Sequence, residues 1–516
     1  MHEPADLILE NAAVITCDAL KPQAEAVAVR NGRIIMIGTC KEVARLINPQ
    51  TRVIDCQHKT LVPGFIDAHC HFFTLVRKFL SLDLNPARAK SIEDIKTILR
   101  HQAVITPPGR WITGMDYNDF YLAEKRHPVR QDLDIAAPHH PVMIVHRSMH
   151  ACILNSLALK IVGITSETEE PPGGMIDRDL ETGEPNGILY EMLGYVQDRM
   201  RTETSREEID RAIEAVDRYF LSLGITSIGE ATVTNDLAQW ETYQKLKRAG
   251  QLHSRINMMP GMNFLTQFQQ AGLLSGSGDH QLRLGPLKIV LNETTGNLCP
   301  SQKELNEIVL EAGWAGFQVA IHAVEVSTVE AAVKALEFAY RTHVQIDPRY
   351  RLEHCSECPP ELRQRLAKLK AVIVTQPSFL YFSGERYLAL IRPEAQPYLY
   401  TVKSWFESGL TVAGSSDSPV VPANPLTGIF SAVTRLAESG QTILPDECIT
   451  AQQALKMFTL NCAYATFEEN LKGSLSTGKL ADMVLLNNNP LTCLSENIKD
   501  ILVEMTVIDG KIVWEK

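Results

Sequence analysis

The chain has 516 residues, of which 45% are hydrophobic and 22% charged, and its formal net charge is −11. This composition is that of a globular protein, and the length exceeds the usual size of one hydrophobic core. Binding to nucleic acid needs clustered Lys and Arg, and no basic run is present, so we expect no nucleic-acid partner. No apolar stretch reaches the ~18 residues of a membrane span, and we expect a small-molecule ligand.

The N-terminal segment and the cysteines both indicate a cytoplasmic protein. The stretch MHEPADLILENAAVITCDAL lacks the basic and apolar regions of a signal peptide. The eleven cysteines are odd in number and irregularly spaced, which does not fit a disulfide framework. Cys355 and Cys358 have CxxC spacing, but a zinc ribbon needs a second such pair, so we interpret them as ordinary buried or surface thiols.

Both ends of the chain are predicted to form short strands and turns. Residues 5–60 contain three strand-like runs, and Asn31-Gly32 marks a hairpin turn within the second of them. The last 35 or so residues have the same character, with a second hairpin turn at Asp509-Gly510. Two strand-rich ends that flank a long middle segment suggest one small β domain made from both termini.

The nonapeptide PGFIDAHCH, which ends at His71, suggests a metal site. Successive side chains of a strand point to opposite faces, so His69 and His71 share one face while Cys70 points the other way. Each histidine alone could be a hydrogen-bonded core residue, but two on one face would bury two polar rings side by side without obvious partners. We therefore interpret the pair as metal ligands.

Between about 75 and 205, proline-containing segments such as ITPPGRW and TEEPPGGMIDRDLETGEPNG interrupt the alternation of strand-like and helical segments that the middle of the chain otherwise shows. We interpret this region as an insertion that covers the mouth of the main domain.

After it, short apolar runs alternate with helical segments, which indicates βα units and a parallel sheet. Most of these runs end in a polar or ionisable residue, as in a (β/α)8 barrel, although periodicity alone leaves a doubly wound open sheet as an alternative. The runs are GITSIGEA, GPLKIVLNE, QVAIHAV, YRLEHC, AVIVTQPS and LTVAGSSDSP.

Four ionisable residues in or just after these later runs complete the candidate site: Lys288, His322, His354 and Asp417. Lys288 is the unusual member, because an ammonium repels cations and is costly to bury. One interpretation is a lysine that reaches solvent or pairs with a carboxylate such as Glu230. The other is a buried neutral amine that reacts with carbon dioxide to form a carbamate, which can bridge two metal ions as a carboxylate would.

At these residues the chain resembles the amidohydrolase superfamily, and within it the YtcJ-like branch that includes N-substituted formamide deformylases. The resemblance runs nearly end to end. The segments that carry it are LVPGFIDAHCHF, RSMHACILNSLALK, PPGGMIDRDLETGEPNGILYE, GITSIGEA, QVAIHAV, RLEHC, TQPS, AGSSDSPV and GSLSTGKLADMVLL.

This resemblance implies an α/β fold in which a (β/α)8 TIM-like barrel carries a small composite β-sandwich. The sandwich would comprise residues 1–60 and 467–516, and the barrel residues 61–466. His69, His71 and Asp417 would bind one divalent metal, His322 and His354 a second, and carbamylated Lys288 would bridge them. Zinc is the expected metal, with manganese or iron as alternatives.

The implied activity is hydrolysis of a C–N bond in a small amide-type molecule, such as an N-substituted formamide or N-acyl compound, by metal-activated hydroxide. Asp417 would transfer the proton. A deaminase or cyclic-amide hydrolase, or a catalytically silent regulatory protein that binds metal, are the alternatives, and a homodimer is compatible with the sequence. The branch commonly has Gly-Asp after the strand-five histidine and often Asp-Gly after the lysine, and this chain departs from both patterns. The expected substrate contacts are His150, Asn155, Glu230, Asn292, Glu293 and Glu325.

Overall fold

The computed structural model describes residues 4–200, 204–342 and 347–516, and the chain divides into two units. Unit 1 comprises Met1–His71, Asp217–Val290 and Gln302–Lys516. Unit 2 comprises Phe72–Val216 and Leu291–Ser301, so it contains the segment predicted as an insertion and adds a short piece from much later in the chain.

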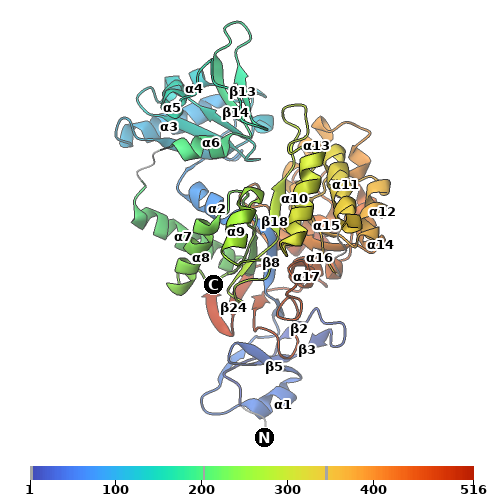
Figure 1. Ribbon diagram of the computed structural model, residues 1–516. Coiled ribbons are helices and arrows are strands. Elements are labelled where there is room, and N and C mark those ends of the chain that lie inside the picture. Colours follow the sequence, from blue (N-terminus) through green and yellow to red (C-terminus); the bar gives the residue numbers. More distant parts are fainter. Residues whose placement is uncertain (1–3, 201–203, 343–346) are drawn as a thin grey trace. The chain divides into compact units, whose positions relative to one another are not determined.

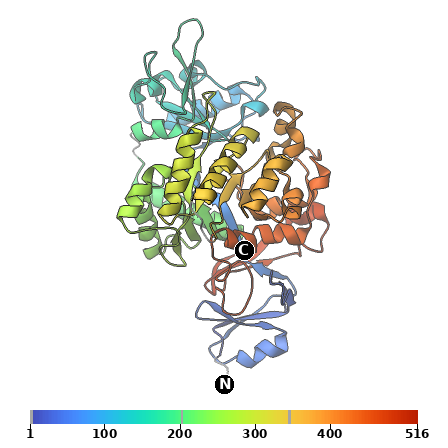
Figure 2. The ribbon, with the colours of Figure 1, turned by 45° about the vertical axis from the view of Figure 1, so that its right-hand side comes forward.

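In unit 1, strands from both ends of the chain share one sheet. Its order is β25-β24-β23-β7-β2-β3, with β23 antiparallel to β7. Leu61, Met483 and Val507 are buried in one apolar core between these strands and the four-stranded sheet β5-β4-β1-β6. The views of Figures 1 and 2 agree that blue N-terminal strands and red C-terminal strands lie side by side. The bounds are β1 Leu7–Glu10, β2 Ala13–Ile15, β3 Gln23–Ala24, β4 Ala26–Arg30, β5 Arg33–Gly38, β6 Arg52–Asp55, β7 Thr60–Pro63, β23 Met483–Leu486, β24 Val503–Ile508 and β25 Lys511–Glu515, with the short helix α1 at Cys40–Val43.

The two predicted hairpin turns are confirmed. Asn31 and Gly32 connect β4 to β5, with φ of 49° and 73°. Asp509 and Gly510 connect β24 to β25, with φ of 51° and 69°. Two successive positive φ values give the turn the twist that the flanking strands need, which is why Asn-Gly and Asp-Gly are favoured there.

The middle of unit 1 consists of parallel strands, and each predicted apolar run contains one. One sheet has the order β17-β16-β15-β8, and the other has the order β18-β19-β20-β21-β22. Hydrogen bonds continue past the sheet edges, from Asp417 N to His69 O (2.8 Å) and from Lys288 N to Pro260 O (2.8 Å). The bounds are β8 Phe65–Cys70, β15 Ile225–Glu230, β16 Arg255–Met258, β17 Leu282–Leu284, β18 Leu287–Val290, β19 Val319–Ala323, β20 Arg351–His354, β21 Val372–Thr375 and β22 Thr411–Gly414.

Helices alternate with these strands, as βα units require. Helices α10 and α11 pack against each other and against β19. The helices of this region are α8 Leu237–Arg248, α9 Leu265–Gln270, α10 Gln302–Trp314, α11 Val326–Thr342, α12 Pro360–Lys368, α13 Ser378–Leu390, α14 Val402–Glu407, α15 Pro425–Thr434, α16 Ala451–Met457 and α17 Leu460–Ala465, and α7 spans Arg206–Ser222.

Unit 2 has a mixed sheet of its own, with the order β13-β14-β12-β11-β10-β9. Apolar residues of β10, β11 and the helices α3 and α4, among them Ile95, Leu133 and Ile144, form a core on this sheet. The bounds are β9 Leu82–Asp83, β10 Ile112–Tyr117, β11 Val142–His146, β12 Ala151–Leu154, β13 Met175–Arg178 and β14 Pro185–Tyr190, with α2 Phe72–Phe79, α3 Ile92–Ile105, α4 Arg130–Ala136, α5 Ser156–Val162 and α6 Leu193–Arg199.

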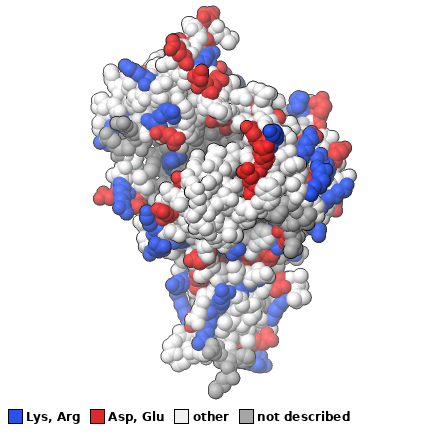
Figure 3. All heavy atoms as spheres, in the orientation of Figure 1, with Lys and Arg blue, Asp and Glu red and all other residues white. Residues whose placement is uncertain are grey.

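Among the described residues, no helix combines the length and the apolar character that crossing a membrane requires. Figure 3 shows acidic and basic side chains interspersed over the face that it draws. The absence of a nucleic-acid partner and of a membrane partner stays a prediction.

A buried ion pair ties β16 to the C-terminal strands. Arg255 donates to both oxygens of Asp482 (2.7 and 2.8 Å) and also to Asp509, and the Arg255 side chain is 1% exposed. Burial alone would raise the pKa of the Asp482 carboxyl, but the charge and hydrogen bonds of Arg255 lower it. The pair therefore depends on both partners.

We expect Arg255→Met to destabilise the protein by about 3–5 kcal/mol, because a buried carboxylate is left without its cation. The measurement is thermal or urea unfolding followed by circular dichroism. The matched control is Lys334→Met, which breaks the exposed pair with Glu330 on α11 and should cost less than about 1 kcal/mol. Equal stability losses in the two variants would contradict the role given to Arg255.

Candidate metal centre

The loop after β22 is hydrogen-bonded along the end of β8, which brings Asp417 beside the two histidines of the HxH motif. Asp417 N donates to His69 O, and His71 N donates to Ser418 O, both at 2.8 Å. Asp67 reinforces this connection, since its carboxylate accepts from the N–H of Ser416 (3.0 Å) and from the Ser416 hydroxyl. Burial raises the pKa of Asp67 to about 7, against these hydrogen bonds, which lower it.

His69, His71 and Asp417 converge as the sequence predicts. One ligand atom from each lies within 4.8 Å of the others. Asp417 Oδ1 is 2.9 Å from His71 Nε2 and 3.5 Å from His69 Nε2. Burial would raise the pKa of Asp417, but its contact with His71 and the nearby His69 and His354 lower it, so Asp417 is a carboxylate at neutral pH. Two imidazoles and a carboxylate form a donor set that suits zinc and related divalent metals.

The Nδ1 atoms of the two HxH histidines are committed to hydrogen bonds away from Asp417. His69 Nδ1 lies 2.5 Å from Glu353 Oε2, and a carboxylate only accepts, so this nitrogen carries the proton. Thr232 gives its single hydroxyl proton to Glu230, so its oxygen accepts from His71 Nδ1–H at 3.0 Å. In both neutral rings the Nε2 lone pair then faces Asp417. Two such acceptors 2.9 Å apart need a cation or proton between them, so these residues fit a metal ion.

His354 presents a further imidazole nitrogen, its Nε2, that could bind a metal ion. Its Nδ1 is 2.8 Å from Gln376 Oε1, whose amide group in turn donates to Ser415 Oγ (2.9 Å). The Nε2 of His354 is buried and has no hydrogen-bond partner among the described residues. A buried orphan nitrogen is costly, and a metal ion would satisfy it. The His354 ring lies 4.9 Å from the ring of His69 and 4.4 Å from the ring of His322, so the predicted second pair of ligands also lies close together.

Two of the predicted ligands occupy strained backbone positions. His354 has φ of 68° and Asp417 has φ of 56°. Non-glycine residues in this region cost roughly 1–3 kcal/mol, and such residues cluster at functional sites. The backbone strain at His354 and Asp417 therefore lies at residues that a metal site would have to hold in fixed positions.

Lys288 lies within this cluster and is not paired with Glu230. Its Nζ is 3.2 Å from His69 Nε2, and the residue is 2% exposed. Burial lowers the pKa of Lys288 to about 8, although nearby Glu353 and Asp417 act in the opposite direction. Glu230 instead accepts from Thr232 Oγ1 (2.5 Å) and from Asn235 Nδ2. Through Thr232, Glu230 lies behind His71, and its contact with substrate stays a prediction.

The segment RSMHACILNS contains two expected substrate contacts, Asn155 and His150, which differ in their exposure and their partners. Asn155 is completely buried and caps α5, where its side-chain oxygen accepts from Ala158 N and Val142 N, both at 3.0 Å. These contacts make it a capping residue, and its contact with substrate stays a prediction. His150 is exposed, and its Nδ1 lies 2.7 Å from Glu191 Oε1.

The remaining expected substrate contacts lie in or beside loops. Asn292 and Glu293 belong to the short piece 291–301 of unit 2, in which Asn292 pairs through its backbone with Cys299. Glu325 is exposed in unit 1 and directly precedes α11. Their contact with substrate stays a prediction. Cys355 and Cys358, interpreted as ordinary thiols, are buried and free of disulfides.

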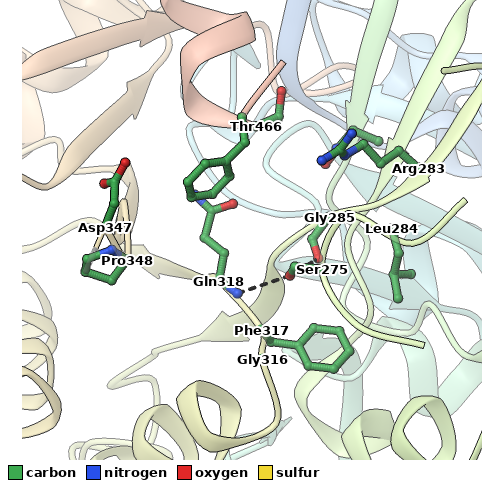
Figure 4. Close-up of a pocket in the computed structure, with 13 residues that line it drawn as sticks. Ser275, Arg283, Leu284, Gly285, Gly316, Phe317, Gln318, Asp347, Pro348 and Thr466 are labelled. Carbon is green, nitrogen blue, oxygen red and sulfur yellow. Dashed lines mark hydrogen bonds between the residues drawn. The ribbon is translucent and has the colours of Figure 1, made fainter. Parts of the chain in front are cut away.

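A cavity of about 450 Å³ is lined by residues that precede β18, β19 and β20, together with residues of β16 and β17. Ser275, Arg283, Phe317 and Gln318 line it, and Gln318 N donates to Ser275 Oγ (3.0 Å), as Figure 4 shows. Gln318 precedes β19, whereas His322 lies near the carboxyl end of that strand. None of the predicted ligands lines this cavity.

In this α/β protein, imidazole and carboxylate donors converge at the carboxyl ends of parallel strands. This arrangement is typical of proteins that bind a metal ion there. Residues 52–514 match the amidohydrolase family, and the chain belongs to this family. It is 30% identical to N-substituted formamide deformylase of Arthrobacter pascens, over 100% of this chain and 99% of that protein. It is 26% identical to the putative amidohydrolase YtcJ of Bacillus subtilis, over 95% and 96% of the two chains. These relatives confirm the resemblance found in the sequence.

Among solved structures, the fold is similar to that of an uncharacterised metal-dependent hydrolase from Pyrococcus furiosus. The TM-score is 0.73 at 23% identity, over 94% of this chain and 100% of that chain. This similarity supports the α/β fold along nearly the whole chain.

Proposed function

We propose that this protein is a metal-dependent hydrolase that cleaves the C–N bond of a small amide-type molecule, with N-substituted formamides and N-acyl amines as the substrate class, and that it acts in the cytoplasm. The observation that carries the proposal is the convergence of His69, His71 and Asp417, with the Nε2 atoms of both histidines facing the carboxylate. The named activity of the Arthrobacter relative supports the choice of substrate class.

The proposed framework is a (β/α)8 barrel with a composite sandwich from both termini and with an insertion at about 75–205. Hydrogen bonds between the β8 and β22 ends, and between Lys288 and Pro260, support a closed ring of strands. One or two divalent ions would be held by His69, His71 and Asp417 and by His322 and His354, with carbamylated Lys288 between them. Zinc suits these donors, and manganese or iron are alternatives.

When bound, such a metal would lower the pKa of a water molecule from 15.7 toward ~7 and polarise a substrate carbonyl. The chain's own contribution is proton transfer and alignment. Asp417 is ionised, borders both Nε2 atoms, and can therefore accept a proton there. It can then deliver that proton to the leaving nitrogen, because an amine must leave protonated.

The function is tested by incubating metal-loaded protein with formamides, N-acyl amines, cyclic imides and aminopurines and measuring turnover of each. We expect the formamides or N-acyl amines to be hydrolysed fastest. Preferential turnover of aminopurines or cyclic imides would instead identify a deaminase or cyclic-amide hydrolase. Failure to turn over any of the four classes, with metal bound, would favour the regulatory alternative.

The metal ligands are tested by metal content. We expect protein purified without chelator to contain one to two equivalents of a divalent transition metal, and the His69→Ala/His71→Ala double variant to lose the site that these residues form. Metal is measured by plasma mass spectrometry, with circular dichroism as the check on folding, since metal binding and folding can be coupled. Undiminished hydrolysis by metal-free wild-type protein would refute the proposal.

A further inference from the structure

We propose that the buried ion pair Arg351–Glu353 is the positioning element that makes His69 a metal ligand. The inference rests on the proposed function, because it assumes a metal at His69. It adds a role for two residues that do not themselves face the metal. Glu353 would hold the proton on Nδ1 of His69 and fix the ring plane, while Arg351 would hold Glu353.

The contacts form one continuous chain. Glu353 Oε2 lies 2.5 Å from His69 Nδ1. Arg351 donates from Nε to Glu353 Oε1 (2.8 Å) and from Nη2 to Glu353 Oε2 (3.1 Å), so that both carboxylate oxygens are held. The same Nη2 donates to Ala68 O (3.0 Å), one residue before His69. Arg351 is therefore anchored to the strand that carries the ligand.

The sequence of β20 explains why these two residues act together. Side chains two apart on a strand share a face, so Arg351 and Glu353 lie on one face of β20. Arg351 and Glu353 are each 0% exposed. A buried carboxylate is tolerated only when it is paired and hydrogen-bonded, and Arg351 supplies that partner.

The contact to His69 differs from those of the other two rings. His71 is held by the neutral hydroxyl of Thr232, and His354 by the neutral amide of Gln376. Among the Nδ1 contacts of His69, His71 and His354, the one from His69 goes to a carboxylate, and charge-assisted hydrogen bonds are roughly twice as strong as neutral ones. A carboxylate behind a ligating histidine also makes the ring a better electron donor, and loss of such a partner typically costs 10–100-fold in metal affinity.

The test is competition between the protein and a chelator for Zn²⁺, measured on the full chain. Glu353→Gln keeps the shape but leaves one acceptor oxygen, while Arg351 and His69 both still present donors. We expect 10–100-fold weaker Zn²⁺ binding. The matched control is Glu468→Gln, which neutralises another buried carboxylate of unit 1, one bonded to Thr466 and Lys472. We expect the affinity of this control to equal that of the wild type, since Glu468 is bonded to none of the predicted ligands.

If Glu353→Gln does not fold, Arg351→Met/Glu353→Leu removes both charges at once, a replacement that buried ion pairs often tolerate. The same loss of affinity is expected. Zn²⁺ binding equal to wild type in a folded Glu353 variant would overturn this inference and leave the proposed function intact. Absence of Zn²⁺ binding by the wild-type protein would overturn the proposed function itself, and this inference with it.

Discussion

Replacing Asp417 with asparagine is expected to abolish turnover while leaving much of the substrate affinity. Asparagine keeps an oxygen that can coordinate a metal, but it cannot accept a proton at neutral pH. If Asp417 transfers the proton, kcat should fall by at least ~10²–10⁴-fold, the usual contribution of a general acid–base group. KM should change little, because the lost interaction is made in the transition state.

The measurement is steady-state kinetics on the best substrate of the panel, with the metal content of each preparation determined alongside. Asp417→Ala is the matched variant, since it removes both the ligand oxygen and the proton acceptor and should lose metal as well as activity. An Asp417→Asn variant that carries its full metal complement and turns over near the wild-type rate would show that another group transfers the proton.

The elements that depend on local sequence could be predicted. The hairpins at Asn31-Gly32 and Asp509-Gly510 follow from backbone conformations that few residue pairs adopt easily. The parallel strands follow from short apolar runs, and the candidate ligands from their position at the ends of those runs. His69, His71 and Asp417 could be grouped because parallel strands present their carboxyl ends at one edge.

The partners behind the ligands could not be predicted in the same way. Glu353, Thr232 and Gln376 contact histidines from other strands, and these pairings depend on register and side-chain direction. Glu230 ends β15 and is bonded to Thr232 and Asn235, contacts that its place in the sequence does not indicate. One available signal was the presence of Arg351 and Glu353 inside an apolar run, since buried charges of opposite sign on one strand face indicate a pair.

Lys288 is the residue on which a bridge between two metals depends. His69 Nδ1 carries a proton toward Glu353, so the Nε2 lone pair points toward Lys288 Nζ, 3.2 Å away. An ammonium there would occupy that lone pair and repel a cation. Burial lowers the pKa of Lys288 to about 8 and so favours the neutral amine as the pH rises through that value. The neutral amine is the form that attacks carbon dioxide. The carbamate that results is an anion, and it would replace the positive charge of the ammonium with a negative charge that attracts metal cations.

We therefore expect Lys288→Ala to lose the second metal and most of the activity, and a short carboxylic acid such as propionate to restore part of both. The acid can supply the bridging carboxylate in the space that the shortened side chain leaves. Lys247→Ala is the matched control, because Lys247 is a partly buried lysine with a pKa lowered by burial, to about 7, and it donates to Ser254 O, away from the predicted ligands. Metal content of this control should be unchanged, and propionate should have no effect on it. Two metals and full activity in Lys288→Ala would refute the bridge. A metal-replete structure with Lys288 as an ammonium paired with Glu230 would also refute it, and would leave a single metal held by His69, His71 and Asp417.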